Sequence, residues 1–84
     1  LEEVEHVLEQ IQGVEKSCCL LDGKRNQLAV FYLGEVKSEE IRKELKSRVP
    51  YYMVPHRLIR TNRFPLNKNG KTDRKVLLQR LEAI

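Results

Sequence analysis

The decapeptide PLNKNGKTDR at residues 65–74 holds the residue types best suited to chemistry in this chain. Gly70, Lys71 and Thr72 match the end of a phosphate-binding loop, but such a loop also needs a glycine five positions before its last one. That position is Pro65 here, so the backbone cannot wrap around a phosphate chain in that manner. Lys71 is therefore either an ordinary lysine in a turn or a lysine that the turn presents to a substrate in another way.

Charge is divided unevenly along the chain. Residues 1–15 carry five acidic residues and no Lys or Arg, whereas residues 57–80 carry eight basic residues against Asp73 alone. A basic end of this kind attracts phosphate or another anion, although a solvated face is the ordinary explanation. Phe64 is the only aromatic residue among these bases, which argues against a platform for stacking nucleic-acid bases. The bases are Arg57, Arg60, Arg63, Lys68, Lys71, Arg74, Lys75 and Arg80.

The cysteine and histidine residues predict neither a disulfide framework nor a metal site. Cys18 and Cys19 are adjacent, and adjacent cysteines can join only in a strained ring. On a strand, one of them would face the core and the other solvent. Unpaired thiols are typical of a reducing compartment, so we expect the protein in the cytoplasm. No apolar run approaches the roughly 20 residues that a membrane helix needs, so no membrane contact is expected.

Hydrophobic periodicity predicts one small α+β domain whose elements follow the order α-β-β-α-β-α. Asp22-Gly23 begins a turn between two strand-like segments and predicts an antiparallel β-hairpin. Ser38 is expected to cap the second helix, Pro50 to end it and Asp73 to begin the third. The predicted elements are a helix at 2–12, strands at 14–21, 27–33 and 56–61, and helices at 38–49 and 73–84. The helical residues expected in the core are Val4, Val7, Leu8, Ile11, Ile41, Leu45, Val49, Leu77, Leu81 and Ile84.

The stretch VPYYMVP at residues 49–55 also departs from ordinary patterning. Pro50 and Pro55 bracket two tyrosines and a methionine, which makes a rigid apolar connector with little conformational freedom to lose. We expect Tyr52, Met53 and Pro55 to pack on the domain's own core.

Together these stretches resemble the signatures of adenylate-forming enzymes. Residues 49–55 resemble Leu-Pro-x-Tyr-Met-Ile-Pro, and residues 69–74 (NGKTDR) resemble Asn-Gly-Lys-Val-Asp-Arg at the expected distance further on. Residues 1–5 (LEEVE) are similar to the end of the preceding signature, Leu-Gly-Glu-Ile-Glu, although Glu2 departs from the common glycine and is closer to the D-alanine ligase variety. The family includes amino-acid adenylation domains of nonribosomal peptide synthetases, D-alanine–carrier protein ligases and acyl-CoA synthetases. The resemblance spans the whole chain, with its motifs in the right order.

The resemblance implies a domain organisation and an activity. Residues 1–84 would be the small C-terminal lid of a two-domain enzyme, with the hinge residue lying before Leu1. The enzyme would activate a carboxylate, expected to be an amino acid such as D-alanine, as acyl-AMP. It would then pass the acyl group to a pantetheine thiol on a carrier protein or CoA. ATP and Mg²⁺ would be bound mainly by the N-terminal adenylation core domain, so the 84-residue chain alone is expected to be inactive.

The resemblance also assigns roles to single residues. Lys71 would be catalytic, because a carboxylate attacking the α-phosphate of ATP builds negative charge that a nearby cation stabilises. Asn69 and Gly70 would hold it in a tight turn, and Asp73 would cap the last helix. Arg74 would be structural, as would the connector residues Pro50, Tyr52, Met53 and Pro55. The lid would rotate after adenylate formation, and the residues then near the thiol tunnel would be Leu1, Glu3 and Glu5.

Two other classes of function remain open from the sequence. One is a small basic binding module for nucleic acid or an acidic protein, which salt-dependent binding of nucleic acid would favour. The other is a purely structural interaction domain. Nucleic acid is not expected as a partner under the ligase interpretation.

Overall fold

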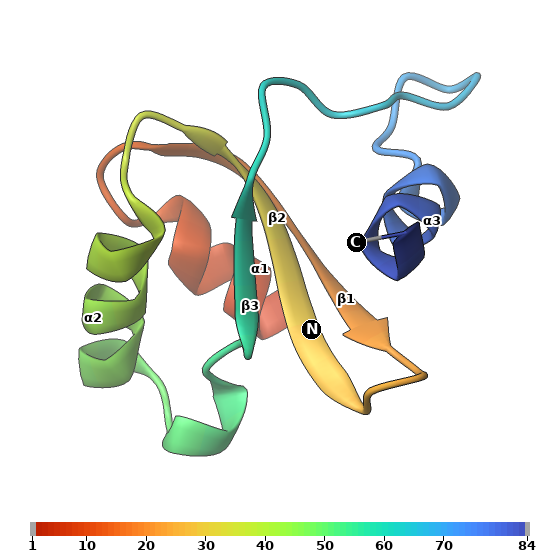
Figure 1. The fold of residues 1–84 in the computed structure, drawn as a ribbon. Helices are drawn as coiled ribbons and strands as arrows, with labels where there is room; N and C mark the ends of the chain where they lie inside the picture. The colour runs from red at the N-terminus through yellow and green to blue at the C-terminus, as the bar shows by residue number, and fades with distance from the viewer. Residues whose placement is uncertain (1, 84) are drawn as a thin grey trace.

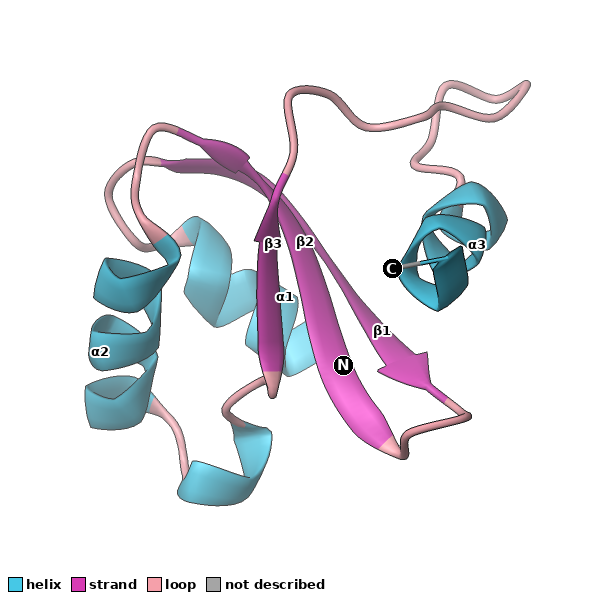
Figure 2. Ribbon diagram, in the orientation of Figure 1, coloured by secondary structure: helices cyan, strands magenta, loops and turns pink. Residues whose placement is uncertain are grey.

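The structure, a computed structural model, describes residues 2–83. Three helices, one short 3₁₀ helix and three strands follow one another in the predicted α-β-β-α-β-α order (Figures 1 and 2), so the predicted α+β class is confirmed. The elements are α1 (Glu2–Glu9), β1 (Val14–Asp22), β2 (Gln27–Gly34), α2 (Ser38–Arg48), η1 (Tyr51–Met53), β3 (Arg57–Arg60) and α3 (Arg74–Ala83).

The three strands form one mixed sheet in the order β1-β2-β3. β1 and β2 pair antiparallel as the predicted hairpin, and the Asp22 carboxylate accepts hydrogen bonds from the N–H groups of Lys24 and Arg25 in its turn. β3 pairs with β2 in parallel, so the chain must cross over between them, and α2 lies in this crossover. Both β1 and β3 are consequently edge strands.

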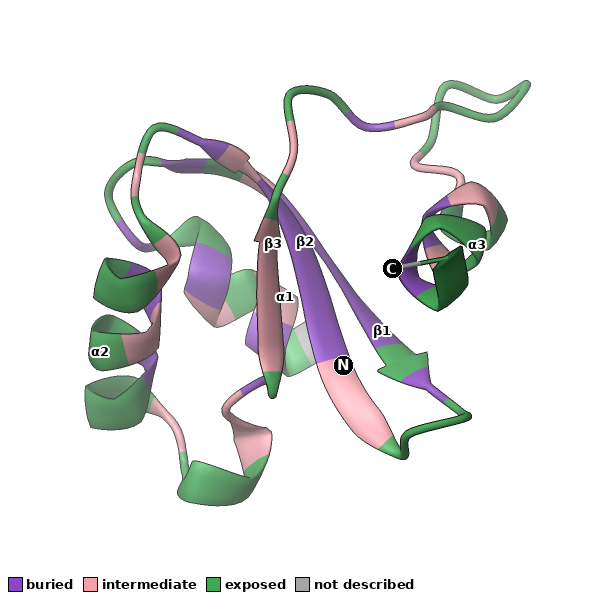
Figure 3. Cartoon of the chain, viewed as in Figure 1, coloured by how far each residue is buried: buried purple, intermediate pink, exposed green. Residues whose placement is uncertain are grey.

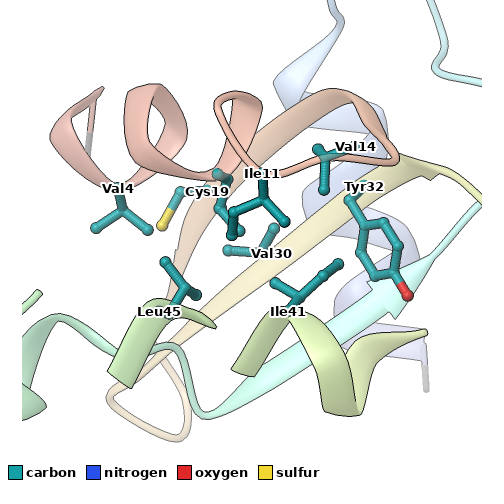
Figure 4. Close-up of a cluster of buried hydrophobic side chains, with 9 residues drawn as sticks. Val4, Ile11, Val14, Cys19, Val30, Tyr32, Ile41 and Leu45 are labelled. Carbon is teal, nitrogen blue, oxygen red and sulfur yellow. The ribbon is translucent and has the colours of Figure 1, made fainter. Parts of the chain in front are cut away.

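Helices cover both faces of the sheet. One face carries buried residues of α1 and α2 against Cys19, Val30 and Tyr32 (Figure 4). The other face carries Cys18 and Phe31 against α3, together with Phe64 from the segment after β3, and Leu77 and Leu81 of α3. The expectation that one cysteine would face solvent is therefore wrong, because α3 covers the second face.

Burial has a chemical consequence for the two thiols. Burial raises the pKa of Cys18 and raises the pKa of Cys19 to about 11, with the Glu5 carboxylate adding to the rise at Cys19. Both cysteines are free and buried, and they act as small apolar residues on opposite faces of β1. Neither is a reactive thiolate at neutral pH.

Two predicted helix boundaries need correction. α1 ends at Glu9 rather than at residue 12, because the N–H groups of Gln10 and Ile11 bond three residues back and tighten the last turn. Ser38 is the first residue of α2 rather than its cap. The N-cap is Lys37, whose side chain makes no capping hydrogen bond. Pro50 does follow the end of α2, and the residue before it is extended, as proline requires.

The apolar stripes of the helices otherwise lie where periodicity placed them. Three of the predicted residues are only half-buried or lie outside the described range, and the rest are buried. Val7 and Val49 pack at the margin of the core formed by α1 and α2. Ile84 lies outside the residues that the structure describes. The buried members are Val4, Leu8, Ile11, Ile41, Leu45, Leu77 and Leu81.

Candidate functional site

Residues 61–73 leave the end of β3, extend away from the sheet and return to α3 (Figure 1). Most of this segment is exposed, in contrast to the strands (Figure 3). Phe64 is its buried residue, at 9% exposure. The segment carries the decapeptide with Lys71, so the residues best suited to chemistry lie on the least enclosed part of the chain.

Hydrogen bonds close residues 66–72 into a small hairpin. Leu66 and Thr72 form an isolated antiparallel bridge, and the N–H of Asn67 donates to the carbonyl of Lys71 at 2.8 Å. The Gly70 N–H donates to the carbonyl of Asn67 at 3.0 Å, which makes a four-residue turn. Gly70 has φ +77°, a conformation that favours glycine. The predicted tight turn is present, with Lys71 directly after it.

Asn67 is the organising residue of this turn, and the sequence interpretation missed it. Its side-chain oxygen accepts hydrogen bonds from the N–H groups of Asn69, at 2.9 Å, and Lys71, at 3.1 Å. Asparagine side chains often accept a hydrogen bond from the backbone N–H two residues further along the chain and so stabilise a turn. Asn67 in the sequence could have indicated this turn. The backbone of Lys71 is therefore fixed on both of its hydrogen-bonding groups by one residue.

The side chain of Lys71 is exposed and uncommitted. Within residues 2–83, the ion pairs involve other residues and none includes the Lys71 ammonium group. The turn thus combines a fixed backbone with a free cation on a flexible stem. Such an arrangement can place a point charge against an anion that another molecule or domain supplies.

Asp73 joins this turn to α3. Its N–H donates to the carbonyl of Pro65 at 2.8 Å, which ties the two ends of the hairpin together. Its carboxylate accepts a hydrogen bond from the Val76 N–H at 3.3 Å, the geometry of an N-terminal helix cap. The turn and the first turn of α3 therefore share a residue.

Arg74, the first residue of α3, makes a closed set of hydrogen bonds with Glu5 of α1 and Cys19 of β1. Its guanidinium donates to the Cys19 carbonyl at 3.0 Å and to the Glu5 carboxylate at 2.9 and 3.2 Å. The same carboxylate accepts a hydrogen bond from the Cys19 N–H at 2.6 Å. Both backbone groups of Cys19 point away from β2, since its N–H and C=O lie on one side of the strand. We call this set the Glu5–Arg74–Cys19 ring.

The connector at residues 49–55 is a proline-bracketed 3₁₀ helix. Pro55 is buried, and Met53 is half-buried against the core formed by α1 and α2. Tyr52 is 69% exposed, so its expected packing on the core is wrong. A single 3₁₀ turn has three residues per turn and cannot bury all of its side chains on one face. Tyr51, 89% exposed, meets Tyr52 edge to face at 5.8 Å between ring centroids.

The residues predicted near a thiol tunnel lie at the start of α1. Leu1 lies outside the described residues. Glu3 is exposed, whereas the Glu5 side chain is 14% exposed and its carboxylate is occupied by the Glu5–Arg74–Cys19 ring. Only Glu3 of these two presents a free carboxylate on the surface.

Two of the basic residues of the C-terminal half are committed to contacts within the fold. Arg60 donates to the Gly34 carbonyl at 2.7 Å and pairs with Glu35 at 3.2 Å. Arg74 is committed to Glu5, as described above. Arg57 is half-buried on β3. The alternative of a basic nucleic-acid module is weaker for this reason, since at least two of its cations serve the fold.

The surface offers shallow hollows rather than an enclosed chamber. The hollow beside the turn has a volume of about 400 Å³, is open to solvent and is lined by Asn67, Thr72, Asp73, Arg74 and Lys75. Over residues 2–83, no three His, Cys, Asp or Glu side chains are grouped as metal ligands would be. None of the helices described is both long and apolar enough to cross a bilayer.

No protein-family model matches the chain, but individual proteins do. A D-alanine–D-alanyl carrier protein ligase of Bacillus anthracis is 36% identical, over 99% of this chain and 19% of the ligase. The N-(5-amino-5-carboxypentanoyl)-L-cysteinyl-D-valine synthase of Penicillium chrysogenum is 35% identical, over 92% of this chain and 2% of the synthase. This chain therefore spans a fifth or less of the length of these relatives.

A solved structure agrees with these matches. A four-domain nonribosomal peptide synthetase bound to AMP and glycine superposes with a TM-score of 0.81 at 37% identity, over 89% of this chain and 6% of that one. The resemblance to the adenylate-forming enzymes is confirmed: along nearly its whole length, this chain is homologous to a segment of nonribosomal peptide synthetases and D-alanine–carrier protein ligases.

Proposed function

We propose that this chain is the C-terminal lid of an ATP-dependent ligase that forms an acyl-AMP and transfers the acyl group to a pantetheine thiol. The single observation that carries the proposal is the exposed Lys71 at the end of a hydrogen-bonded turn, in a chain homologous to segments of such ligases. The chain offers no enclosed pocket in its described part, so the nucleotide and the acyl group belong in a neighbouring N-terminal core domain.

Lys71 would act by charge. When a carboxylate attacks the α-phosphate of ATP, two anions approach and negative charge grows on the phosphorus oxygens. A pre-positioned cation stabilises this charge more in the transition state than in the ground state, and so it accelerates the step. Asn67 and Gly70 serve this role indirectly, since they fix the backbone from which the lysine extends.

The substrate and partners follow from the relatives. An amino acid is the proposed substrate, with D-alanine one candidate, and a carrier protein bearing phosphopantetheine is the proposed acceptor. Mg²⁺ would neutralise part of the phosphate charge. ATP and Mg²⁺ would be bound mainly by the core domain. An ATP-consuming ligase of this kind would work in the cytoplasm.

The lid would also move. After the adenylate forms, a rigid-body rotation about a hinge would withdraw Lys71 and bring another face of the lid, near Glu3, toward the thiol. Asp73 hydrogen-bonds both the turn and the first turn of α3. This connection suits a rigid-body motion, because Lys71 would move together with α3.

The test measures the two half-reactions separately in the full-length enzyme. Lys71→Ala should slow adenylate formation by roughly a hundredfold to several thousandfold, the effect of removing one transition-state charge contact. Transfer from a supplied acyl-adenylate to the thiol should survive. Lys71→Arg should rescue poorly, because a planar guanidinium does not replace a compact ammonium group in a tight space.

Lys68 provides the matched control, since it is an exposed cation on the same turn. Lys68→Ala should leave both half-reactions within about twofold of the original enzyme, as expected for a surface substitution. Intact adenylation in Lys71→Ala, or equal loss of both steps, would contradict the proposal. The 84-residue chain alone should show no adenylate formation, which pyrophosphate exchange can measure.

A further inference from the structure

We propose that Glu5 and Arg74 are positioning residues that hold Lys71 in place for adenylate formation. This inference rests on the proposed function of Lys71. It concerns two residues of other elements, one at the start of the chain and one at the start of α3, which are 69 positions apart in sequence. Neither would touch the reacting groups, because both are committed to β1 and to each other.

The first step of the argument is that the turn is a unit with few attachments to the rest of the domain. Its hydrogen bonds, from Asn67 to Lys71 and from Asp73 to Pro65, are internal to the segment. They fix its shape but not its direction relative to the sheet. Its direction must be set where the segment joins the packed body of the domain.

Two attachments do this. Phe64 is buried on the α3 face of the sheet, and the Lys16 ammonium group lies 5.6 Å from the centre of its ring. At the other end, Arg74 holds the start of α3 to β1 through the Glu5–Arg74–Cys19 ring. Only three Cα–Cα steps separate Lys71 from Arg74, at most about 11 Å of chain, so the orientation of Arg74 limits where Lys71 can lie.

Each position in the ring requires either a hydrogen-bond donor or an acceptor, and the two cannot be exchanged. The Cys19 N–H needs an acceptor, which Glu5 provides, and the Cys19 carbonyl needs a donor, which Arg74 provides. The Nη1 group of Arg74 donates to the Cys19 carbonyl, and its Nη2 group donates to both oxygens of the Glu5 carboxylate, which closes the ring. Exchanging the two charges would place a donor against the N–H and an acceptor against the carbonyl. A plain ion pair would tolerate such an exchange, whereas this ring would not.

Stability does not depend mainly on this ring. The Arg74 side chain is 49% exposed, and partly exposed ion pairs contribute little to folding. Leu77 and Leu81, both fully buried, keep α3 on the sheet. Variants of Arg74 and Glu5 should therefore stay folded, and their effects on catalysis can be measured.

The experiment compares Arg74→Lys and Glu5→Gln in the full-length enzyme, each alone and combined with Lys71→Ala. Lysine keeps the charge but has one donor nitrogen in place of the two that bind Cys19 and Glu5, and glutamine removes the charge and one acceptor. Each single variant should slow adenylate formation about tenfold to a hundredfold, as small displacements of a catalytic group do. Transfer from a supplied acyl-adenylate should stay within about twofold.

The combined variants supply the decisive readout. If Arg74 acts through Lys71, Arg74→Lys should change adenylate formation by less than about twofold once Lys71 is alanine. The exchanged pair Glu5→Arg with Arg74→Glu should fail to restore the rate. Arg80→Lys, on an exposed position of α3, is the matched control and should behave like the original enzyme.

The outcomes separate this inference from the proposed function. If Lys71→Ala leaves adenylation intact, the proposed function itself is wrong. If Lys71→Ala is impaired but Arg74→Lys and Glu5→Gln are not, only the positioning role is overturned. A full additional loss in the Lys71→Ala background, or rescue by the exchanged pair, also overturns it. The positioning role is supported if Arg74→Lys and Glu5→Gln slow adenylate formation only in the enzyme that retains Lys71.

Discussion

The core between α1, α2 and the sheet and the turn that carries Lys71 are held together in opposite ways. The core buries Leu8, Ile41 and Leu45 completely, whereas the turn from residue 66 to 72 has mostly exposed side chains and is shaped by hydrogen bonds. Core residues contribute free energy of folding in proportion to the apolar area they bury. The turn contributes little burial, but it leaves a cation free. Stability and chemistry are therefore separated along this chain, and mutations in the two regions should have separate effects.

The largest expected effect on stability lies in the core. Leu8→Ala should lower the free energy of unfolding by about 2 to 5 kcal/mol, because a fully buried leucine leaves a cavity when it is truncated. Lys71→Ala should change it by no more than about 0.5 kcal/mol, as is usual for exposed side chains. Urea denaturation of both variants measures the contrast. Comparable losses in the two would show that the turn is part of the stabilising core.

The connector tests an intermediate case. Met53 is half-buried at the margin of the core, so Met53→Ala should cost about 1 to 2 kcal/mol, less than a fully buried methionine would. Tyr52→Ala, at a position 69% exposed, is the control and should stay within about 0.5 kcal/mol. Chemical denaturation gives both values. A larger loss for Tyr52 than for Met53 would mean that the tyrosine packs on the domain after all.

The turn has its own, smaller sensitivity to backbone conformation. Gly70→Ala should destabilise the chain by about 1 kcal/mol, because the new residue must keep a positive φ. The added methyl meets no atom within 4 Å, so the cost would come from the backbone alone. Gly23 is equally open but has no positive φ, and Gly23→Ala should be neutral or slightly stabilising. Equal effects at the two glycines would remove the conformational argument.

The smallest effect concerns the buried thiol of Cys19. Its pKa is raised to about 11 in the folded state, so the folded protein keeps a proton that the unfolded chain loses above about pH 9. Stability should thus be complete below pH 9 and fall as the pH rises toward 11, by roughly 1 kcal/mol or less at pH 9.5. Unfolding measured at pH 8 and 9.5 should show this slope, and Cys19→Ala should reduce it, leaving the contribution of Cys18. An unchanged slope in that variant would assign the effect to other groups.

The elements of the fold were predictable because local patterns determine them. Spacing of apolar residues located Leu8, Ile41 and Leu77 on buried helix faces, and Asp22-Gly23 located the hairpin. The burial of both Cys18 and Cys19 was not predicted. The nearly continuous apolar run of β2 is typical of a strand covered on both faces and could have indicated it.

The arrangement around Lys71 was only partly predictable. The asparagine-glycine pair indicated a tight turn, and Asp73 indicated a helix start. The contact between Glu5 and Arg74 depends on how α1, β1 and α3 pack, and no local signal connects residues so far apart in sequence. The roles assigned to Lys71, Asn69 and Gly70 remain predictions that the half-reaction measurements address.

The Glu5–Arg74–Cys19 ring also affects whether the edge of the sheet can pair with a strand of another molecule. β1 is an edge strand, and an unpaired strand edge is a template on which another chain can add a strand and begin to aggregate. At Cys19 the position of the next strand is already taken by a carboxylate that accepts and a guanidinium that donates, as a neighbouring peptide would. The opposite edge, β3, is only four residues long and begins and ends in arginine. If the proposed lid motion occurs, the side chains at Cys19 would keep this edge of the sheet from pairing with a foreign strand while the lid is detached.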